Sequence, residues 1–232
     1  MRRKCDESAP KAHVSRFPGT PRPSLNCVAR PLRDFYEGIY HLAARGSDIR
    51  HLFLTDRDRE EFLGRLDATW QQFELDLLSY VLLGSHYHAL VRIPDARLSQ
   101  ALQQLHTEYS RWHNRRHGRS AHLFRAHAMT KPITSDRQLI AAYRYLALNP
   151  VEAGLVTDPL AWRWSSARAH AGLEQPRIPL REGDLRAAFG AAEDWRDHYR
   201  RTIEAAAAET RSPTQPRTPS SSSDPRSSAA SR

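Results

Sequence analysis

The amino-acid sequence predicts an α+β fold with an antiparallel sheet. Short apolar runs with strand character alternate with longer amphipathic segments of helical spacing. Two of the runs are separated by only the turn residues Gly84 and Ser85. Strands joined by so short a turn run antiparallel, whereas a parallel pair needs a long crossover. The 232 residues suit one domain with tails.

The first half of the chain is expected to form three strands and one helix. Residues 38–44 (GIYHLAA) predict a strand, and residues 75–83 and 86–93 predict a hairpin around the turn. Between them, Thr55 and Asp56 are expected to cap a helix. The apolar positions that follow this cap have helical spacing: Phe62, Leu63, Leu66 and Trp70.

The clearest helical stripe in the chain comes next. It is formed by Leu98, Leu102, Leu105, Tyr109 and Trp112. Residues 124–133 are expected to form a strand that Pro132 breaks.

A helix that carries two tyrosines is predicted after this strand. Ser135 and Gln138 have the spacing of a capping box, and we expect the helix to run to about Leu148. Pro150 is expected to end it, because the residue before a proline is pushed out of the helical region. A last amphipathic helix is predicted from the apolar positions Trp195, Tyr199 and Ile203.

The charge balance favours a polyanionic partner. The formal net charge is +9, which indicates nucleic acid or an anionic surface. Residues 1–29 are predicted to be a basic flexible arm, and residues 211–232 a disordered tail rich in Ser, Pro and Arg. For both tails, phosphate contacts and a solvated segment without a specific role remain alternatives.

Several classes of protein are disfavoured. No apolar run reaches the roughly 18 residues of a membrane span, so we expect no membrane partner and a cytoplasmic, nucleoid-associated protein. Cys5 and Cys27 form no C-x-x-C pair, which disfavours a zinc finger or a redox motif. A P-loop, a G-x-S-x-G elbow and an H-E-x-x-H motif are all missing, so a reaction driven by nucleotide hydrolysis is not indicated.

Two pairs of histidines have the spacing of metal ligands. His86 and His88 lie two apart on a predicted strand, so their rings share a face and could chelate one divalent ion. The alternative is a polar pair on the solvent face. His113 and His117 lie four apart on a helix but sit among arginines, which disfavour a cation. We interpret this second pair as part of a basic, phosphate-facing surface.

Tyr145 and Asn149 lie one helical turn apart on the same face. Tyr143 falls on the apolar stripe and is expected in the core, whereas Tyr145 points about 120° away from that stripe. Asn149 offers an amide oxygen, which suits hard cations. The alternative is a partly exposed helix tyrosine followed by an asparagine C-cap.

Three segments in order resemble the HUH-type single-tyrosine transposases, most closely the REP-associated tyrosine transposases. The segments are GIYHL with Arg45-Gly46, YVLL leading into HYHALV at residues 86–91, and YRYLALNPV at residues 143–151, followed by Trp164-Ser165-Ser166. The resemblance covers about residues 28–208. It implies a ferredoxin-like sandwich, with a catalytic domain at residues 30–175 and a C-terminal helical extension at residues 176–210.

The resemblance also implies roles for individual residues. Tyr145 matches the nucleophile, and His86, His88 and Asn149 match the ligands of one divalent ion, expected to be Mg²⁺ or Mn²⁺. The implied activity is cleavage and rejoining of single-stranded DNA near palindromic hairpins, by a monomer or a homodimer. The family usually has Pro-Asn or Pro-Glu at positions 84–85, and often an aromatic residue or His at Ala147. The change at positions 84–85 is expected to loosen the turn or to alter which base is held there.

Contacts with the DNA backbone are expected from basic residues. They are Arg111, Arg115, Arg116, Arg119 and Lys131. Tyr87, Trp112 and Phe124 are candidate stacking surfaces for unpaired bases, although Trp112 also fits the core stripe. Two other functions stay open: a non-catalytic DNA-binding protein derived from such a transposase, and a basic RNA-binding module.

Overall fold

The computed structural model describes residues 35–47, 51–125, 128–190 and 194–211. The predicted arm, residues 1–29, lies outside the described residues, as does the tail beyond residue 211. The elements in chain order are β1 (Gly38–Arg45), α1 (Asp56–Gln72), β2 (Asp76–Leu82), β3 (His86–Ile93), α2 (Leu98–Arg116), β4 (Met129–Ile133), α3 (Asp136–Glu152), a 3-10 turn (Pro159–Ala161), α4 (Ala167–His170), α5 (Gly183–Ala188) and α6 (Trp195–Arg211).

The four strands form one antiparallel sheet in the order β2-β3-β1-β4. The sequence order β1-α1-β2-β3-α2-β4 with this strand order is the ferredoxin-like arrangement. The predicted α+β class and antiparallel sheet are therefore confirmed.

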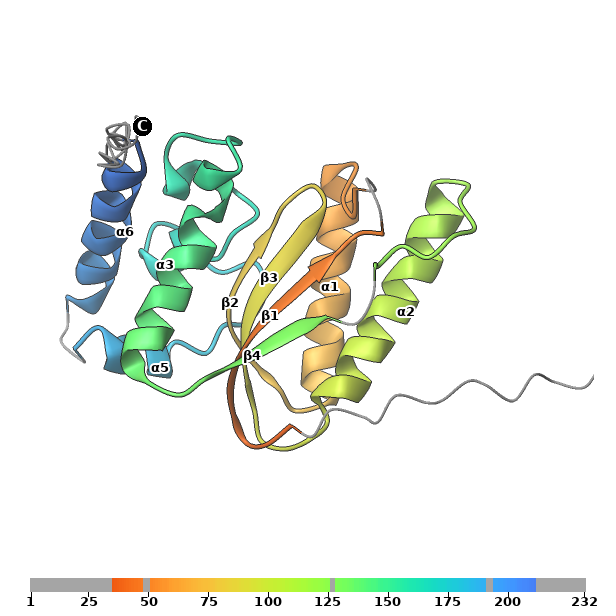
Figure 1. Cartoon of the computed structure of the whole chain (residues 1–232), viewed down its shortest axis with the longest axis horizontal. Coiled ribbons are helices and arrows are strands. Elements are labelled where there is room, and N and C mark those ends of the chain that lie inside the picture. Colours follow the sequence, from red (N-terminus) through yellow and green to blue (C-terminus); the bar gives the residue numbers. More distant parts are fainter. Residues whose placement is uncertain (1–34, 48–50, 126–127, 191–193, 212–232) are drawn as a thin grey trace, which may run out of the picture. The chain divides into compact units, whose positions relative to one another are not determined.

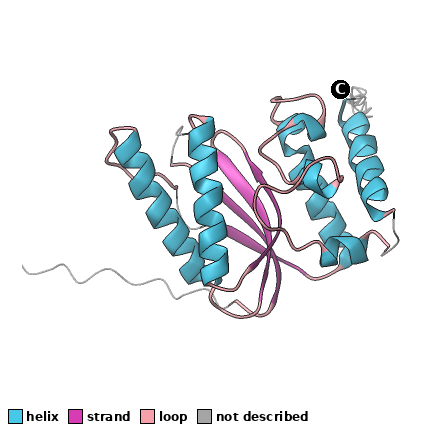
Figure 2. Ribbon diagram, turned by 180° about the vertical axis from the view of Figure 1, so that it is seen from behind, coloured by secondary structure: helices cyan, strands magenta, loops and turns pink. Residues whose placement is uncertain are grey.

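Helices cover both faces of the sheet (Figures 1 and 2). Helices α1 and α2 pack on one face, and α3 with the C-terminal helices lies on the other. Successive strand residues point to opposite faces, so Tyr87 packs on Phe62 of α1, whereas Leu90 joins the core cluster that contains Leu139 and Tyr143 of α3. The same alternation turns His86 and His88 towards α3.

Two prolines lie inside elements that they were predicted to break or end. Pro132 pairs with Tyr40 within β4. Because β4 is an edge strand, one side of its backbone needs no hydrogen-bond donor, which is where proline is tolerated. The strand also begins at Met129, later than predicted. Pro150 is buried in the last turn of α3, which continues to Glu152, so tertiary packing outweighs the local preference to stop.

The helix caps follow the sequence closely. Thr55 caps α1 in a reciprocal box with Asp58, whose Oδ2 accepts hydrogen bonds from the backbone N–H groups of Leu54 and Thr55, both at 2.8 Å. Ser135 caps α3 as predicted, but the side chain of Gln138 accepts from the N–H of Thr134 rather than completing a box with Ser135.

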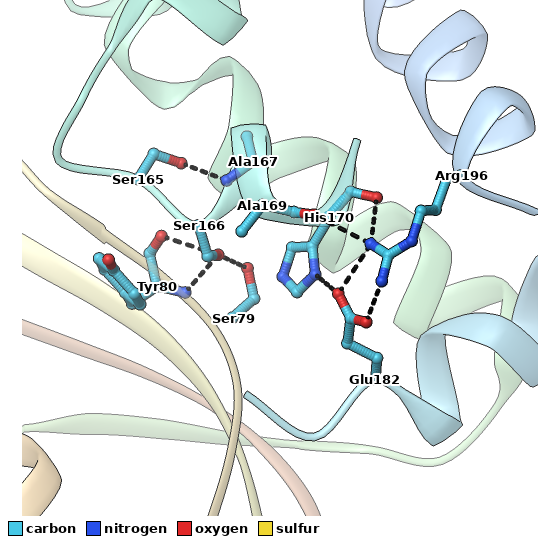
Figure 3. A network of polar contacts seen from close by, with 9 residues as sticks. All are labelled: Ser79, Tyr80, Ser165, Ser166, Ala167, Ala169, His170, Glu182 and Arg196. Carbon is cyan, nitrogen blue, oxygen red and sulfur yellow. Dashed lines mark hydrogen bonds and ion pairs between the residues drawn. The ribbon is translucent and has the colours of Figure 1, made fainter. Parts of the chain in front are cut away.

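The segment after α3 covers the outer edge of β2. Leu82 N–H donates to the carbonyl of Trp164, and Ser166 N–H donates to the carbonyl of Tyr80. The Ser166 hydroxyl also lies 2.8 Å from that of Ser79 and accepts from Tyr80 N–H at 3.0 Å (Figure 3). The Trp164-Ser165-Ser166 motif therefore protects this sheet edge from pairing with another chain.

A second polar network attaches the C-terminal helices (Figure 3). Glu182 pairs with Arg196 at 2.6 Å and contacts Nδ1 of buried His170 at 3.4 Å. Arg196 also donates to the carbonyls of Ala169 and His170. Residues of α5 and α6 enter the same core cluster as Tyr143: Leu185, Trp195, Tyr199 and Ile203. No helix in the described part of the chain is both long and apolar enough to cross a membrane.

Candidate functional site

The two histidines of the H-x-H motif lie at the start of β3. Their ring centroids are 5.2 Å apart, with His86 half-buried and His88 buried. The hairpin turn before them is closed by a hydrogen bond from Leu83 N–H to the carbonyl of His86 at 2.9 Å. Gly84 and Ser85 thus form a two-residue turn closed by this hydrogen bond, and the expected effect of the change at these positions stays a prediction. A Cβ added at Gly84 would lie 2.9 Å from Nδ1 of His51, whose exposed side chain can move aside.

A third imidazole, which the sequence analysis missed, completes this cluster. Nε2 of His41 on β1 lies 3.1 Å from Nδ1 of His88. The register pairs Ala43 with His88, and His41 lies two residues away on the same face. The bond engages Nδ1 of His88, so Nε2 is the nitrogen that can coordinate an ion. A lone histidine in a strand gives no spacing signal, so only the pairing of β1 with β3 reveals it.

Helix α3 brings Tyr145 and Asn149 to the same place. The Tyr145 ring lies 5.2 Å from that of His88 and 5.6 Å from that of His41, approaching both edge-on. Tyr145 is 38% exposed, whereas Tyr143 is fully buried, as predicted. The Asn149 side chain hydrogen-bonds His86. Asn149 lies within the helix, and Ala153 is the C-cap, so the C-cap alternative for Asn149 is wrong.

Burial keeps these imidazoles neutral. Burial, reinforced by the neighbouring His41 and His86, lowers the pKa of His88 to about 3. Burial and the charge of Arg45 lower the pKa of His86, although its bond to Asn149 opposes this. Burial and the charge of Lys131 lower the pKa of His41. Neutral imidazoles are the form that coordinates metal ions, so the cluster holds its ligands ready at neutral pH.

Comparison with known proteins relates part of the chain to a described family. The family described as "Transposase IS200 like" matches residues 34–145. Residues 34–145 are therefore similar to the IS200-like transposases, and we call them the IS200-like segment. The match ends at Tyr145, so Asn149 lies beyond it. No curated protein matches the chain.

A solved structure has the same fold as the IS200-like segment and its surroundings. It is described as the structure of a REP-associated tyrosine transposase bound to a REP hairpin. It superposes with a TM-score of 0.53 at 13% sequence identity, covering 64% of this chain and 94% of its own. The predicted resemblance to this group of transposases is confirmed, and the likeness in structure shows the fold.

Basic side chains flank the histidine cluster of the IS200-like segment. Arg45 lies opposite His86 in the β1–β3 register, and Lys131 lies opposite His41 in the β1–β4 register. The predicted backbone contacts in and after α2 are all exposed: Arg111, Arg115, Arg116 and Arg119. The end of α2 and the start of β3 lie at the same end of the sheet (Figure 1).

The three residues predicted to stack on unpaired bases differ in how deeply they are buried. Tyr87 is fully buried against Phe62, because it points to the α1 face of the sheet, so it is unable to stack on a base. Phe124 is partly buried and stacks on His106 at 3.9 Å. Trp112 is partly buried and lies at the edge of the core.

The interpretation of His113 and His117 as a phosphate-facing surface is wrong. His113 is fully buried, because its side chain points into the protein from the last turn of α2, whereas the side chain of Trp112 lies at the edge of the core. His117 lies 2.9 Å from Oδ1 of Asp58 in the first turn of α1. One ligand atom each from Asp58, His113 and His117 lie within 4.8 Å of one another, so these three residues could hold a metal ion. Nothing in the sequence indicated that Asp58, a residue of the α1 capping box, could be a metal ligand.

Proposed function

We propose that this chain cleaves and rejoins single-stranded DNA near palindromic hairpins, with Tyr145 as the nucleophile. His86, His88 and Asn149 would hold one Mg²⁺ or Mn²⁺ ion. The observation that carries the proposal is the meeting of α3 with β3: the Tyr145 ring lies 5.2 Å from His88, and Asn149 bonds His86. A non-catalytic DNA-binding protein is the alternative that the experiment below separates.

The residues present fit a divalent ion. Two neutral imidazoles and an amide oxygen supply three ligand atoms without adding charge, so solvent and phosphate oxygens would complete the shell. His41 fixes the ring of His88, as a hydrogen bond to the distal nitrogen does in most histidine-liganded sites. When bound, the ion would polarise a non-bridging oxygen of the scissile phosphate.

The proposed reaction is a transesterification at phosphorus, which needs no nucleotide hydrolysis. The phenol oxygen of Tyr145 would form a bond to phosphorus and lose its proton, while the bond to the 3′ oxygen breaks and that oxygen takes up a proton. A 5′-phosphotyrosine and a free 3′-hydroxyl result. A second 3′-hydroxyl can reverse the step, because one phosphoester replaces another of similar energy. The missing P-loop agrees with this.

The surrounding charges would position the DNA. Arg45 and Lys131 stand beside the histidine cluster, and the exposed arginines of α2 extend the positive surface at the same end of the sheet. Affinity is expected to fall steeply with salt, because each neutralised phosphate releases counterions. The solved REP-associated transposase with the same fold is bound to a REP hairpin, which supports a hairpin substrate.

The decisive experiment compares two tyrosines of one helix. Wild-type protein is incubated with hairpin-bearing single-stranded DNA and Mn²⁺, and covalent adducts are resolved on a denaturing gel. Tyr145→Phe is expected to abolish the adduct and leave binding nearly intact. Tyr143→Phe is the matched control and should retain the adduct, because the Tyr143 ring is buried away from the site.

The metal is tested in the same assay. His86→Ala should fail to cleave even at raised Mn²⁺, because one of three ligands is gone. Cleavage by Tyr145→Phe would disprove the nucleophile, and full activity of His86→Ala would disprove the metal site. Binding by the wild type without any adduct would favour the non-catalytic alternative.

A further inference from the structure

A second cluster of potential ligands lies on the other face of the sheet. Asp58 comes from the first turn of α1, His113 from the last turn of α2, and His117 is its C-cap. Asp58 and His113 are fully buried, and His117 is mostly buried, with its side chain 17% exposed. The rings of His113 and His117 are 4.4 Å apart between centroids. Side chains of this chemistry rarely meet below the surface unless they share a partner.

The ring nitrogens of buried His113 need hydrogen-bond partners. Neither its Nδ1 nor its Nε2 has a hydrogen-bond partner among the described residues, although both nitrogens are buried. A neutral imidazole always carries one N–H donor and one lone pair. Buried polar groups are almost always paired, so an orphaned ring in the core calls for a missing partner. Its neighbours in the cluster are another imidazole and a carboxylate, which are ligands rather than apolar packing.

We propose that Asp58, His113 and His117 bind a zinc ion that joins the start of α1 to the end of α2. Histidines at i and i+4 lie on one helix face and chelate a single ion in many zinc sites. Two imidazoles and one carboxylate are a known three-residue zinc set, with water in the fourth position. The nitrogen ligands favour zinc over Mg²⁺, which prefers oxygen.

The carboxylate of Asp58 is already held in the orientation that the site needs. Its Oδ2 accepts two backbone N–H groups of the α1 cap, and its Oδ1 points to His117. Ligating carboxylates are commonly fixed by such outer hydrogen bonds.

One competitor for the carboxylate is present. Nε of Arg116 lies 3.6 Å from Oδ1 of Asp58, but its side chain is 43% exposed and can turn towards solvent. Without an ion, His117 and Asp58 would form a simple hydrogen bond, and that is the rival explanation. It leaves His113 unexplained. With an ion, the end of α2 is fixed next to α1, and the arginines around it are presented from a rigid helix.

The site is independent of the proposed catalytic ion, because His86 and His88 face α3 on the opposite side of the sheet. The experiment uses the full, tag-free chain, stripped with chelator, equilibrated with Zn²⁺ at neutral pH, and passed over a desalting column. Zinc is then measured by mass spectrometry. Because the H-x-H pair can also take zinc, the central comparison is made in the double variant His86→Ala/His88→Ala.

We expect this double variant to retain one equivalent of zinc, and chelator to lower its Tm by about 5–10 °C. Adding His117→Gln should remove the zinc and the chelator effect; this residue is partly exposed, so the fold should survive. His113→Leu should do the same. Absence of zinc from His86→Ala/His88→Ala, or zinc retention after both His113→Leu and His117→Gln, would overturn the proposal and leave the hydrogen bond alone. DNA cleavage does not enter these measurements.

Discussion

At the scale of single residues, the site depends on one histidine that no local pattern marks. His41 lies 47 positions before His88, and the hydrogen bond between their rings exists only because β1 pairs with β3. His86, His88, Tyr145 and Asn149 could be proposed from spacing, since i+2 and i+4 relations fix a common face within one element. Contacts between residues of different elements follow no such spacing in the sequence. His113 is a second residue whose place the sequence could not predict, because its burial depends on which face of α2 packs against α1.

His41 is predicted to act on the metal site through His88. Replacing His41 with Ala should raise the Mn²⁺ concentration needed for half-maximal cleavage by about 10–100-fold, because the ring of His88 loses its orientation. The measurement is a Mn²⁺ titration of adduct formation. His41→Gln, which can still donate or accept a hydrogen bond, should recover part of the affinity.

The neighbouring residue provides the control for His41. Tyr40 points to the other face of β1, where its hydroxyl contacts the backbone of Tyr36. Tyr40→Phe should leave the Mn²⁺ dependence unchanged. If His41→Ala titrates like the wild type, His41 has no positioning role and the 3.1 Å contact is structural only.

At the scale of elements, the sequence predicted which segments are helices and strands better than where they end. Apolar periodicity located β1, the β2–β3 hairpin, α2 and α6, because burying one face of an element imposes it. Pro132 and Pro150 were misjudged, since the effect of a proline depends on whether its missing N–H would have been used. That depends on the neighbouring strand or on the packing of the helix. The reach of α3 to Glu152 is what places Asn149 beside His86.

The Glu182 network is predicted to hold the C-terminal helices on α3. Glu182→Ala would leave Arg196 with carbonyl partners only and remove the side-chain partner of buried His170. The free energy of unfolding should fall by about 1–3 kcal/mol, measured by urea denaturation. Asp197→Ala removes an exposed pair with Arg200 on the same helix and should cost less than about 0.5 kcal/mol. Equal losses in the two variants would show that the network adds nothing beyond a surface ion pair.

At the scale of the whole molecule, the sheet separates two histidine clusters. One faces α3 with Tyr145, and the other lies between α1 and α2 with Asp58. Both are near the end of the sheet where β3 begins and α2 ends (Figure 1). In the two proposals, DNA would bind at this positively charged end of the protein. The cluster beside Tyr145 would cleave the DNA, and the cluster with Asp58 would hold in place the helix that carries the arginines.

Histidines whose pKa is lowered in the fold also predict how the stability of the whole protein depends on pH. Burial lowers the pKa of His106 to about 3, and that of His88 also to about 3, against about 6.5 in an unfolded chain. Between these values the unfolded chain binds protons that the folded chain does not. Stability should therefore be unaffected by these groups above pH ~6.5 and fall below it, by about 1 kcal/mol per pH unit for each histidine.

Urea unfolding between pH 7.5 and pH 4.5, with chelator present to remove bound ions, measures this slope. His106→Gln should flatten it, because Gln can keep a hydrogen bond to the hydroxyl of Tyr87, which lies 2.8 Å from His106 in the fold, but takes up no proton on unfolding. His122→Gln changes an exposed histidine and is the matched control for a His→Gln substitution. An unchanged slope in His106→Gln would mean that His106 is protonated in the folded protein, which its stacking on Phe124 argues against.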